Sequence, residues 1–256
     1  MKHYEKLLKM GCFTWYELCS ILDNPSTAST LIQSYLKKGY IQSVKRGLYV
    51  AVDLATNEPA VSKFHIASKI TDGSYVSHHA AFEYYGCVNQ LSYDVNVSSD
   101  IRFNSFDFNG NMFSYIASRI STGIVTVNGV RVTDKERTVL DGINDFEKVM
   151  GLEELLRCLD MLPTVNEEKL LEYLDIWGKQ ALYQKAGFIL EHFKELWGLN
   201  ENFFNHCEAK IGKSKRYLCA SNDYGEMKYN SRWRLVVPEN LMTITQKGIV
   251  EVDDEI

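Results

Sequence analysis

The first 56 residues alternate short apolar stripes with turn signals, a pattern typical of a small helical module. Residues 3–10 and 15–22 both carry apolar side chains at helical spacing. Thr14 immediately precedes the second stripe, and Glu17 lies three residues after Thr14. This spacing is the pattern of a capping box. We therefore expect two short helices here, the second beginning directly after Thr14.

A third apolar stripe follows a turn signal and ends in two lysines and a glycine. We expect Ser26 or Thr27 to cap this helix, and Lys37-Lys38-Gly39 to end it. Two β-prone runs come next, at 40–44 and 48–52, with the basic turn Lys45-Arg46-Gly47 between them. Three helices followed by a basic hairpin is the order of a winged helix-turn-helix.

The third helix separates its apolar and polar residues onto opposite faces. One face is apolar, while the other presents short hydroxyl side chains, Gln33 and Lys37, which suits close approach to a DNA major groove. The candidate DNA contacts are Ser26, Thr27, Ser29, Thr30, Gln33, Lys37, Lys38, Lys45 and Arg46. The alternative is a helical subdomain with a hairpin that makes protein contacts only.

The remainder of the chain mixes strand and helix patterns, so the predicted fold class is α+β. Helices are expected at 60–72, 78–85, 134–144, 151–161, 166–177, 180–196 and 200–209. Strands are expected at 74–76, 91–97, 102–108, 112–120, 124–127, 130–132, 216–221 and 231–237. Asn128-Gly129 marks a tight hairpin, and Thr133 with Glu136 indicates a second capping box.

The predicted organisation is a winged helix-turn-helix domain at 1–56 and a mixed α/β domain at 57–256. The larger domain divides further into a sheet-containing part at 57–145 and a mainly helical part at 146–256.

The distribution of charge along the chain supports this division into two domains. The whole chain has a net charge of −5, which alone argues against nonspecific nucleic-acid binding. However, residues 1–56 hold seven cations and four acids, a net of +3, so the other 200 residues carry −8. Opposite charges on two parts of one chain fit a DNA-binding module joined to an acidic partner domain.

Two charged clusters in the larger domain are weaker signals. Residues 145–177 hold nine acids against three bases, which indicates either a solvated helical face or a docking face for a basic protein. A possible secondary basic patch comprises Lys210, Lys213, Lys215 and Arg216. This patch is interpreted either as a solvated loop or as a second contact for nucleic acid or a partner protein.

Catalytic and metal-binding patterns are poor, so we expect no enzymatic activity, no metal and no cofactor. The Gly212-Lys213-Ser214 tripeptide resembles the end of a phosphate-binding loop, but Cys207 stands where that loop needs glycine. A nuclease-like pattern at Glu208-Ala209-Lys210 recurs twice elsewhere, as chance would give. His78 and His79 are interpreted as surface or cap residues.

No apolar stretch is long enough to span a membrane, and the N-terminus lacks a signal-peptide pattern. The six cysteines form no closely spaced pair, and we expect most of them to be small core residues. The sequence thus predicts a cytoplasmic protein with no membrane partner.

Several segments in order resemble the AbiEi-like antitoxin family of type IV toxin–antitoxin systems, which are also described as predicted transcriptional regulators. The matching pieces are Arg46-Gly47-Leu48-Tyr49, Ser77-His78-His79-Ala80-Ala81 with Tyr85-Gly86, Val132 to Asp141, and Ala186 to Glu191. The resemblance extends to about residue 237 and is looser after residue 145. The Thr133–Asp141 piece also has a structural interpretation as the start of a helix followed by a core face.

The resemblance implies an antitoxin that binds inverted repeats in its own promoter through the winged helix and represses it. It further implies a role in phage defence, in which the C-terminal domain counteracts a nucleotidyltransferase-like toxin, possibly without a stable complex. The alternatives are a stand-alone winged-helix regulator, a protein-interaction module without a toxin, and a nuclease fused to a winged helix.

Overall fold

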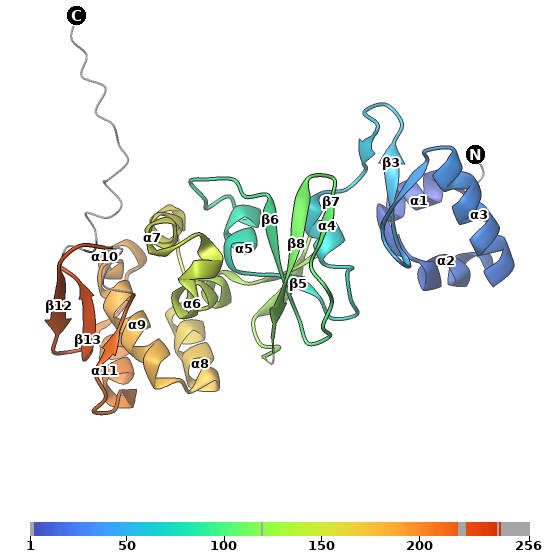
Figure 1. Ribbon diagram of the computed structural model, residues 1–256. Helices are drawn as coiled ribbons and strands as arrows, with labels where there is room; N and C mark the ends of the chain where they lie inside the picture. Colours follow the sequence, from blue (N-terminus) through green and yellow to red (C-terminus); the bar gives the residue numbers. More distant parts are fainter. Residues whose placement is uncertain (1–2, 119, 220–223, 240, 242–256) are drawn as a thin grey trace, which may run out of the picture. The chain divides into compact units, whose positions relative to one another are not determined.

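The computed structural model describes residues 3–118, 120–219, 224–239 and 241, and it has an α+β fold (Figure 1). The described chain forms two compact units, each built from separate stretches of sequence. Unit 1 comprises Met1–Val76, Tyr93–Arg119 and Ile124–Val132, and unit 2 comprises Ser77–Ser92, Ile120–Gly123 and Thr133–Ile256. These limits divide the chain elsewhere than the predicted boundary at residue 56, because the strands that follow that boundary belong to unit 1.

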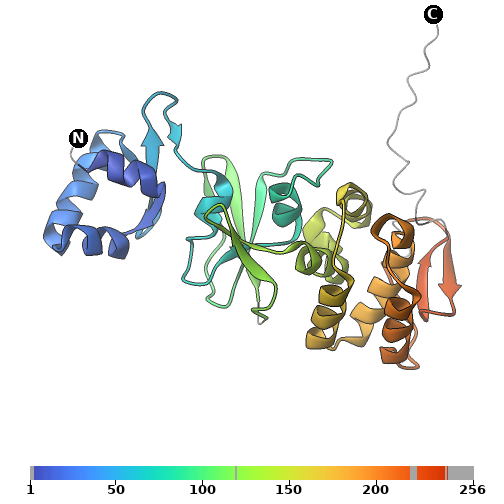
Figure 2. The same cartoon turned by 180° about the vertical axis from the view of Figure 1, so that it is seen from behind.

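The N-terminal part of unit 1 contains the three predicted helices and the predicted hairpin, together with two short strands, Cys12–Thr14 and Glu58–Pro59, that were not predicted. Its elements are α1 (Tyr4–Met10), β1 (Cys12–Thr14), α2 (Trp15–Leu22), α3 (Pro25–Lys37), β2 (Ile41–Lys45), β3 (Leu48–Asp53) and β4 (Glu58–Pro59). Strand β3 pairs antiparallel with β1, β2 and β4. Figure 2 shows the three helices beside the strands of this sheet. Their small apolar core includes Leu7, Phe13, Leu18 and Ile32.

The helix caps of this part confirm one prediction and correct another. Thr14 and Glu17 form the predicted reciprocal capping box at the start of α2. Neither Ser26 nor Thr27 caps α3, however. The cap is Asn24, whose side-chain oxygen accepts the backbone N–H groups of both residues, at 2.9 and 3.1 Å. The helix starts earlier than predicted because proline is well suited to its first position, as Pro25 shows.

The rest of unit 1 is a six-stranded mixed sheet with strand order β7-β8-β6-β5-β10-β9. Its elements are α4 (Lys63–Ala67), β5 (Tyr75–Val76), β6 (Asp94–Ser99), β7 (Phe106–Phe108), β8 (Asn111–Ala117), β9 (Ile124–Val127) and β10 (Val130–Thr133). The Asn128-Gly129 turn has positive φ at both residues, 48° and 80°, as a two-residue hairpin of type I′ requires. The helix predicted over 60–72 is wrong in extent, since only Lys63–Ala67 is helical.

Unit 2 is mainly helical and ends in a three-stranded sheet of order β11-β13-β12 (Figure 1). Its elements are α5 (His78–Tyr84), α6 (Lys135–Asn144), the 3-10 helix η1 (Phe146–Val149), α7 (Leu152–Met161), α8 (Glu167–Trp177), α9 (Gln180–Glu191), α10 (Lys194–Trp197), α11 (Glu201–Lys210), β11 (Arg216–Tyr217), β12 (Met227–Asn230) and β13 (Leu235–Pro238). A large apolar core runs through these elements and includes Phe82, Leu140, Leu156, Phe204 and Trp233.

Four expectations for unit 2 need correction or completion. The predicted helix at 180–196 is broken at His192-Phe193, and strand β12 was not predicted. The strand predicted at 231–237 begins only at Leu235. Of the strand predicted at 216–221, the structure shows Arg216–Tyr217, and residues 220 and 221 lie outside the described residues.

The predicted capping box at Thr133 is also wrong, because the N-cap of α6 is Asp134. The Asp134 carboxylate accepts the backbone N–H of Arg137 at 2.9 Å. The hydroxyl of Thr133 instead lies 2.7 Å from the hydroxyl of Thr138, inside unit 2. Glu136 does not close a box, since it accepts the backbone N–H of Asn166 at 2.7 Å.

Candidate nucleic-acid interface

Helix α3 buries one face and exposes the other. Ala28, Ile32 and Tyr35 are buried in the core of unit 1. The predicted contacts on the other face are all exposed: Ser26, Thr27, Ser29, Thr30, Gln33, Lys37 and, directly after the helix, Lys38. The apolar and polar faces predicted from the sequence are therefore present in the structure.

The exposed side chains of α3 differ in how far they are already engaged. The Thr30 hydroxyl donates to the Ser26 carbonyl at 3.0 Å, one helical turn back. Within the described residues, Gln33, Lys37 and Lys38 make no side-chain hydrogen bond or ion pair. These three side chains are thus available to contact another molecule.

Trp15 connects α3 to the hairpin turn. Its backbone N–H donates to the Gly47 carbonyl at 2.9 Å, and its indole N–H donates to the Ser29 hydroxyl at 3.5 Å. Tyr16 follows and is 76% exposed, and no sequence pattern predicted its place beside the hairpin turn. The Ser29 side of α3, the start of α2 and the hairpin turn consequently form one surface, which we call the α3 surface.

The two predicted hairpin cations have different surroundings. The Lys45 ammonium donates to the Ile70 carbonyl at 3.1 Å and lies 5.5 Å from the centroid of the Phe103 ring. Burial of this lysine lowers its pKa. Arg46 is exposed and has no side-chain partner among the described residues, so it is the hairpin cation that can reach a phosphate.

A recess of about 640 Å³ lies beside the hairpin turn. Two further cations, Lys69 and Arg131, line this recess. Lys69 forms an ion pair with Glu17, on the capping box of α2. The Arg131 guanidinium has no side-chain partner within the part of the chain that the structure describes. Sequence reasoning missed both cations because they are distant from the hairpin along the chain and belong to no recognisable motif.

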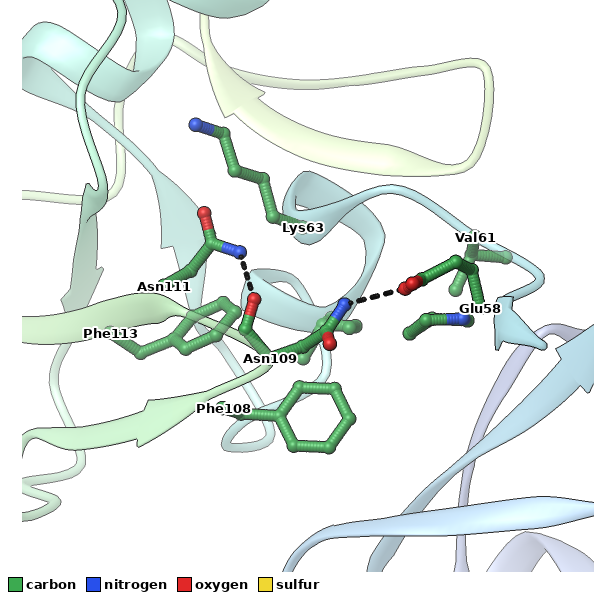
Figure 3. Close-up of a pocket in the computed structure, with 9 residues that line it drawn as sticks. Glu58, Val61, Lys63, Phe108, Asn109, Asn111 and Phe113 are labelled. Atoms are coloured by element: carbon green, nitrogen blue, oxygen red, sulfur yellow. Dashed lines mark hydrogen bonds between the residues drawn. The ribbon is translucent and has the colours of Figure 1, made fainter. Parts of the chain in front are cut away.

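A smaller recess in unit 1, of about 160 Å³, lies between β4 and the turn that joins β7 to β8 (Figure 3). The Asn109 amide donates to the Glu58 carboxylate at 3.0 Å, and the Asn111 amide donates to the Asn109 carbonyl at 3.1 Å. Ligand pockets are usually about 300–1,000 Å³. The size and the internal hydrogen bonds therefore indicate a structural junction.

The secondary basic patch lies in unit 2, from the last residue of α11 to the first residue of β11, and its four residues are exposed: Lys210, Lys213, Lys215 and Arg216. The structure brings Lys210 toward Asp175 rather than to the others, with 3.5 Å between ammonium and carboxylate. Lys215 and Arg216 line a separate recess of unit 2.

The segment from Thr133 to Asp141 is an internal polar network of unit 2. The Arg137 guanidinium donates to both Asp141 carboxylate oxygens, at 3.0 and 3.1 Å, and to the Thr122 carbonyl at 2.7 Å. Asp134 accepts the Tyr173 hydroxyl at 2.7 Å and the Lys169 ammonium at 3.1 Å. Because these buried polar groups satisfy one another, the segment has a structural role.

The interpretation of His78 and His79 as surface or cap residues is wrong. Both are buried, at 5% and 1% exposure. Burial lowers the pKa of His78. His79 lies 3.7 Å from the Glu154 carboxylate, which also accepts the backbone N–H of Asn89. The pair belongs to the core because α5 packs against α6 and η1.

Within the described residues, no three histidine, cysteine or acidic side chains are placed to hold a metal ion. Across the same part of the chain, no helix combines the length and apolar character needed to cross a membrane.

Comparisons with known proteins show a likeness of fold and no family. A scan against protein-family models finds no match, and a search of curated proteins finds none. The chain is similar in fold to the RV2827C protein from Mycobacterium tuberculosis, known from a crystal structure. The likeness covers 95% of this chain and 92% of that chain, with a TM-score of 0.65 at 12% sequence identity. At this identity the likeness shows the α+β fold alone.

Proposed function

We propose that this chain is a DNA-binding antitoxin that represses its own promoter through the α3 surface and counteracts a nucleotidyltransferase-like toxin. The observation that carries the DNA half is the exposed polar face of α3, with Gln33, Lys37 and Lys38 unengaged among the described residues. The toxin half rests on the family resemblance of the sequence. Both roles are binding functions, and the proposal includes no catalysis and no cofactor.

The α3 surface has the chemistry for duplex DNA. In the winged helix-turn-helix interpretation, α3 enters the major groove, where short hydroxyl side chains allow close approach and an amide such as Gln33 can pair with adenine. Lys37, Lys38 and Arg46 would contact phosphates on either side. Such contacts supply most of the affinity and weaken with salt.

A small number of cations limits the affinity of one copy, so we propose that two copies bind an operator of inverted repeats. Half-sites on one face of the duplex then lie about 34–36 Å apart, or at multiples of that distance. A protein with this role works in the cytoplasm, the compartment that holds the promoter.

The DNA half is tested by fluorescence anisotropy with the full-length protein and the duplex upstream of its own gene. We expect affinity to fall steeply with salt, and Arg46→Ala to reduce the slope of log affinity against log salt by about 1. Lys9→Ala, which removes an exposed cation from α1, is the charge-matched control and should leave the slope nearly unchanged. Absence of binding at low salt would overturn the DNA half.

The toxin half is tested by expression of the neighbouring gene with and without this chain. We expect growth arrest by the neighbour alone and rescue by the full chain. A variant with Gln33→Ala and Arg46→Ala should still rescue growth when both genes are expressed from foreign promoters, because the α3 surface serves repression only. Failure of the wild-type chain to rescue would contradict the toxin half and leave the DNA half intact.

A further inference from the structure

We infer that the three-stranded sheet of unit 2 carries a second nucleic-acid site, specific for single strands. The site consists of Tyr217 and Tyr229 with Lys215 near both rings, and we call it the tyrosine platform. It lies in the sheet of β11, β12 and β13 (Figure 1). Nothing in it overlaps the α3 surface, so the two sites are independent.

The register of the sheet places the two tyrosines side by side. Tyr217 on β11 and Tyr229 on β12 are both paired with Val236 of the central strand. Residues directly opposite one another across neighbouring strands share a face of the sheet. Tyr217, Val236 and Tyr229 therefore form one row across the same face.

Both rings have more than half of their surface exposed. Tyr217 is 59% exposed and Tyr229 is 51% exposed, while Val236 between them is 7% exposed. Neither hydroxyl takes part in a hydrogen bond among the described residues. Core packing does not explain why two large rings stand in register on an outer face, whereas stacking with a planar ligand would.

Lys215 adds a cation to this aromatic row. Its ammonium lies 5.8 Å from the centroid of the Tyr217 ring and 5.4 Å from that of Tyr229. Alternating aromatic rings and cations is the arrangement by which proteins hold single strands, because bases stack on the rings and phosphates pair with the cations. In a duplex the bases are already stacked on each other, so the exposed rings favour a single strand.

A recess beside the platform provides room for a phosphate. It has a volume of about 440 Å³ and is lined by Lys185, Lys215, Arg216 and Tyr217, among others. That volume lies within the range of small-ligand pockets and is large enough for one nucleotide. The Lys185 ammonium lies 5.1 Å from the centroid of the Phe146 ring, and burial lowers its pKa, so a nearby anion would favour its charged form.

The charge of the surrounding segment points to a polyanion. Residues 210–234 hold seven cations and two acids, a net of +5, within a part of the chain that is otherwise acidic. Not all of this charge is available, since Arg232 is held by Glu191, Glu201 and Glu208. Lys213, Lys215 and Lys228 are exposed and form no ion pair among the described residues, and Lys215 is the one that lies near both rings.

The test is fluorescence anisotropy of the full-length protein with labelled oligouridylate and oligothymidylate of about 12 nucleotides, a length within the usual range of such sites. We expect binding at low ionic strength to at least one of the two, and the comparison between them tells RNA from DNA. Tyr217→Ala and Tyr229→Ala should each weaken binding at least about fivefold. Lys215→Gln should reduce the salt slope by about 0.7.

Matched variants show whether the tyrosine rings bind by stacking. The Tyr217→Phe/Tyr229→Phe double variant should keep the affinity for the oligonucleotides, because the ring stacks on a base and the hydroxyl does not take part. Tyr93→Ala is the control, since it removes another exposed tyrosine ring, which belongs to unit 1. Neither tyrosine variant of the platform should change binding of the upstream duplex.

Three results would overturn the inference. The first is no binding of either single strand at low ionic strength. The second is equal binding by the wild type and the Tyr217→Ala/Tyr229→Ala double variant, which would indicate a basic patch without stacking. The third is capture of an acidic protein through the same tyrosines by a chain that binds neither oligonucleotide.

Discussion

Helices α3 and α6 both begin at a polar cap, and they differ in what their polar residues do. The cap is Asn24 in α3 and Asp134 in α6, and both helices carry threonine and other polar side chains. In α3, only Ala28, Ile32 and Tyr35 are buried. In α6, every residue from Glu136 to Ile143 is buried, with the charged groups included. The comparison separates polar residues that hold a unit together from those that face outward.

The difference lies in partners rather than in residue type. Arg137 of α6 has a carboxylate, two backbone carbonyls and the Trp177 ring, whose centroid lies 4.7 Å from its guanidinium carbon. Arg46 next to α3 has no side-chain partner among the described residues. A buried charge must be paired, so Arg137 is part of the architecture, whereas an exposed charge without a partner is available for binding.

The largest effect should follow from removal of Arg137. Arg137→Leu leaves Asp141 buried and unpaired, and we expect unit 2 to lose about 3–5 kcal/mol of unfolding free energy. The measurement is urea unfolding followed by fluorine NMR of fluorotryptophan-labelled protein, in which Trp177, Trp197 and Trp233 report on unit 2 and Trp15 reports on unit 1.

Arg157→Leu is the matched control for that prediction. Arg157 also pairs with an acid four residues away, Glu153, but the two side chains are 20% and 42% exposed. Exposed pairs of this spacing contribute about 0.3–0.5 kcal/mol. Equal losses for the two arginine variants would show that burial does not distinguish the two kinds of polar residue.

The helix caps give the second-largest effect. Asp134→Ala removes the cap of α6 together with the contacts from Tyr173 and Lys169, and we expect a loss of about 2–3 kcal/mol. Asn24→Ala removes only the exposed cap of α3, and the expected loss is about 1 kcal/mol. The same fluorine resonances measure both. A larger loss for Asn24→Ala would reverse the comparison.

Much of the α3 side of this comparison could be predicted from the sequence, because the determinants are local. Periodicity, the Thr14–Glu17 box and the turn glycine fix the helices and the hairpin of the N-terminal part. The availability of Lys45 could not be predicted, since it is decided by the Ile70 carbonyl and by rings from β7 and its neighbourhood.

The α6 side could not be predicted in the same way, because its determinants are distant in sequence. Thr133 and Glu136 have the spacing of a capping box, but each has another hydrogen-bond partner. The Thr133 hydroxyl bonds to the Thr138 hydroxyl, and the Glu136 carboxylate accepts the backbone N–H of Asn166. The tyrosine platform has the same limitation. Tyr217 and Tyr229 come into register only through Val236, and no local pattern shows that pairing.

On α3, a polar substitution should change binding and leave stability nearly unchanged. Gln33→Ala removes an exposed side chain without partners among the described residues, so we expect a change in unfolding free energy within about 0.5 kcal/mol. The preference for the upstream duplex over a scrambled one should fall by about tenfold, near the lower end of the value of one bidentate base contact. Competition anisotropy measures this ratio, and an unchanged ratio would remove Gln33 from base recognition.

The smallest effect should come from pH, through the capping box that orders Trp15 beside α3. Burial alone would raise the pKa of Glu17, but hydrogen bonds from Lys69 and Thr14 outweigh it and hold that pKa below its ordinary value of 4.5. A carboxylate with a lowered pKa stabilises the folded state above its ordinary pKa and loses that contribution as pH falls through the folded value.

Because the pair with Lys69 is more than one-third exposed, the effect should stay below about 1 kcal/mol. The difference in unfolding free energy between wild type and Glu17→Gln, followed by the Trp15 resonance in urea, should be constant well above the ordinary pKa of 4.5 and should shrink as pH falls below it. The exposed Glu5→Gln on α1 is the control, and a difference for Glu17→Gln that persists unchanged at low pH would show that the charge of Glu17 contributes nothing to the capping box.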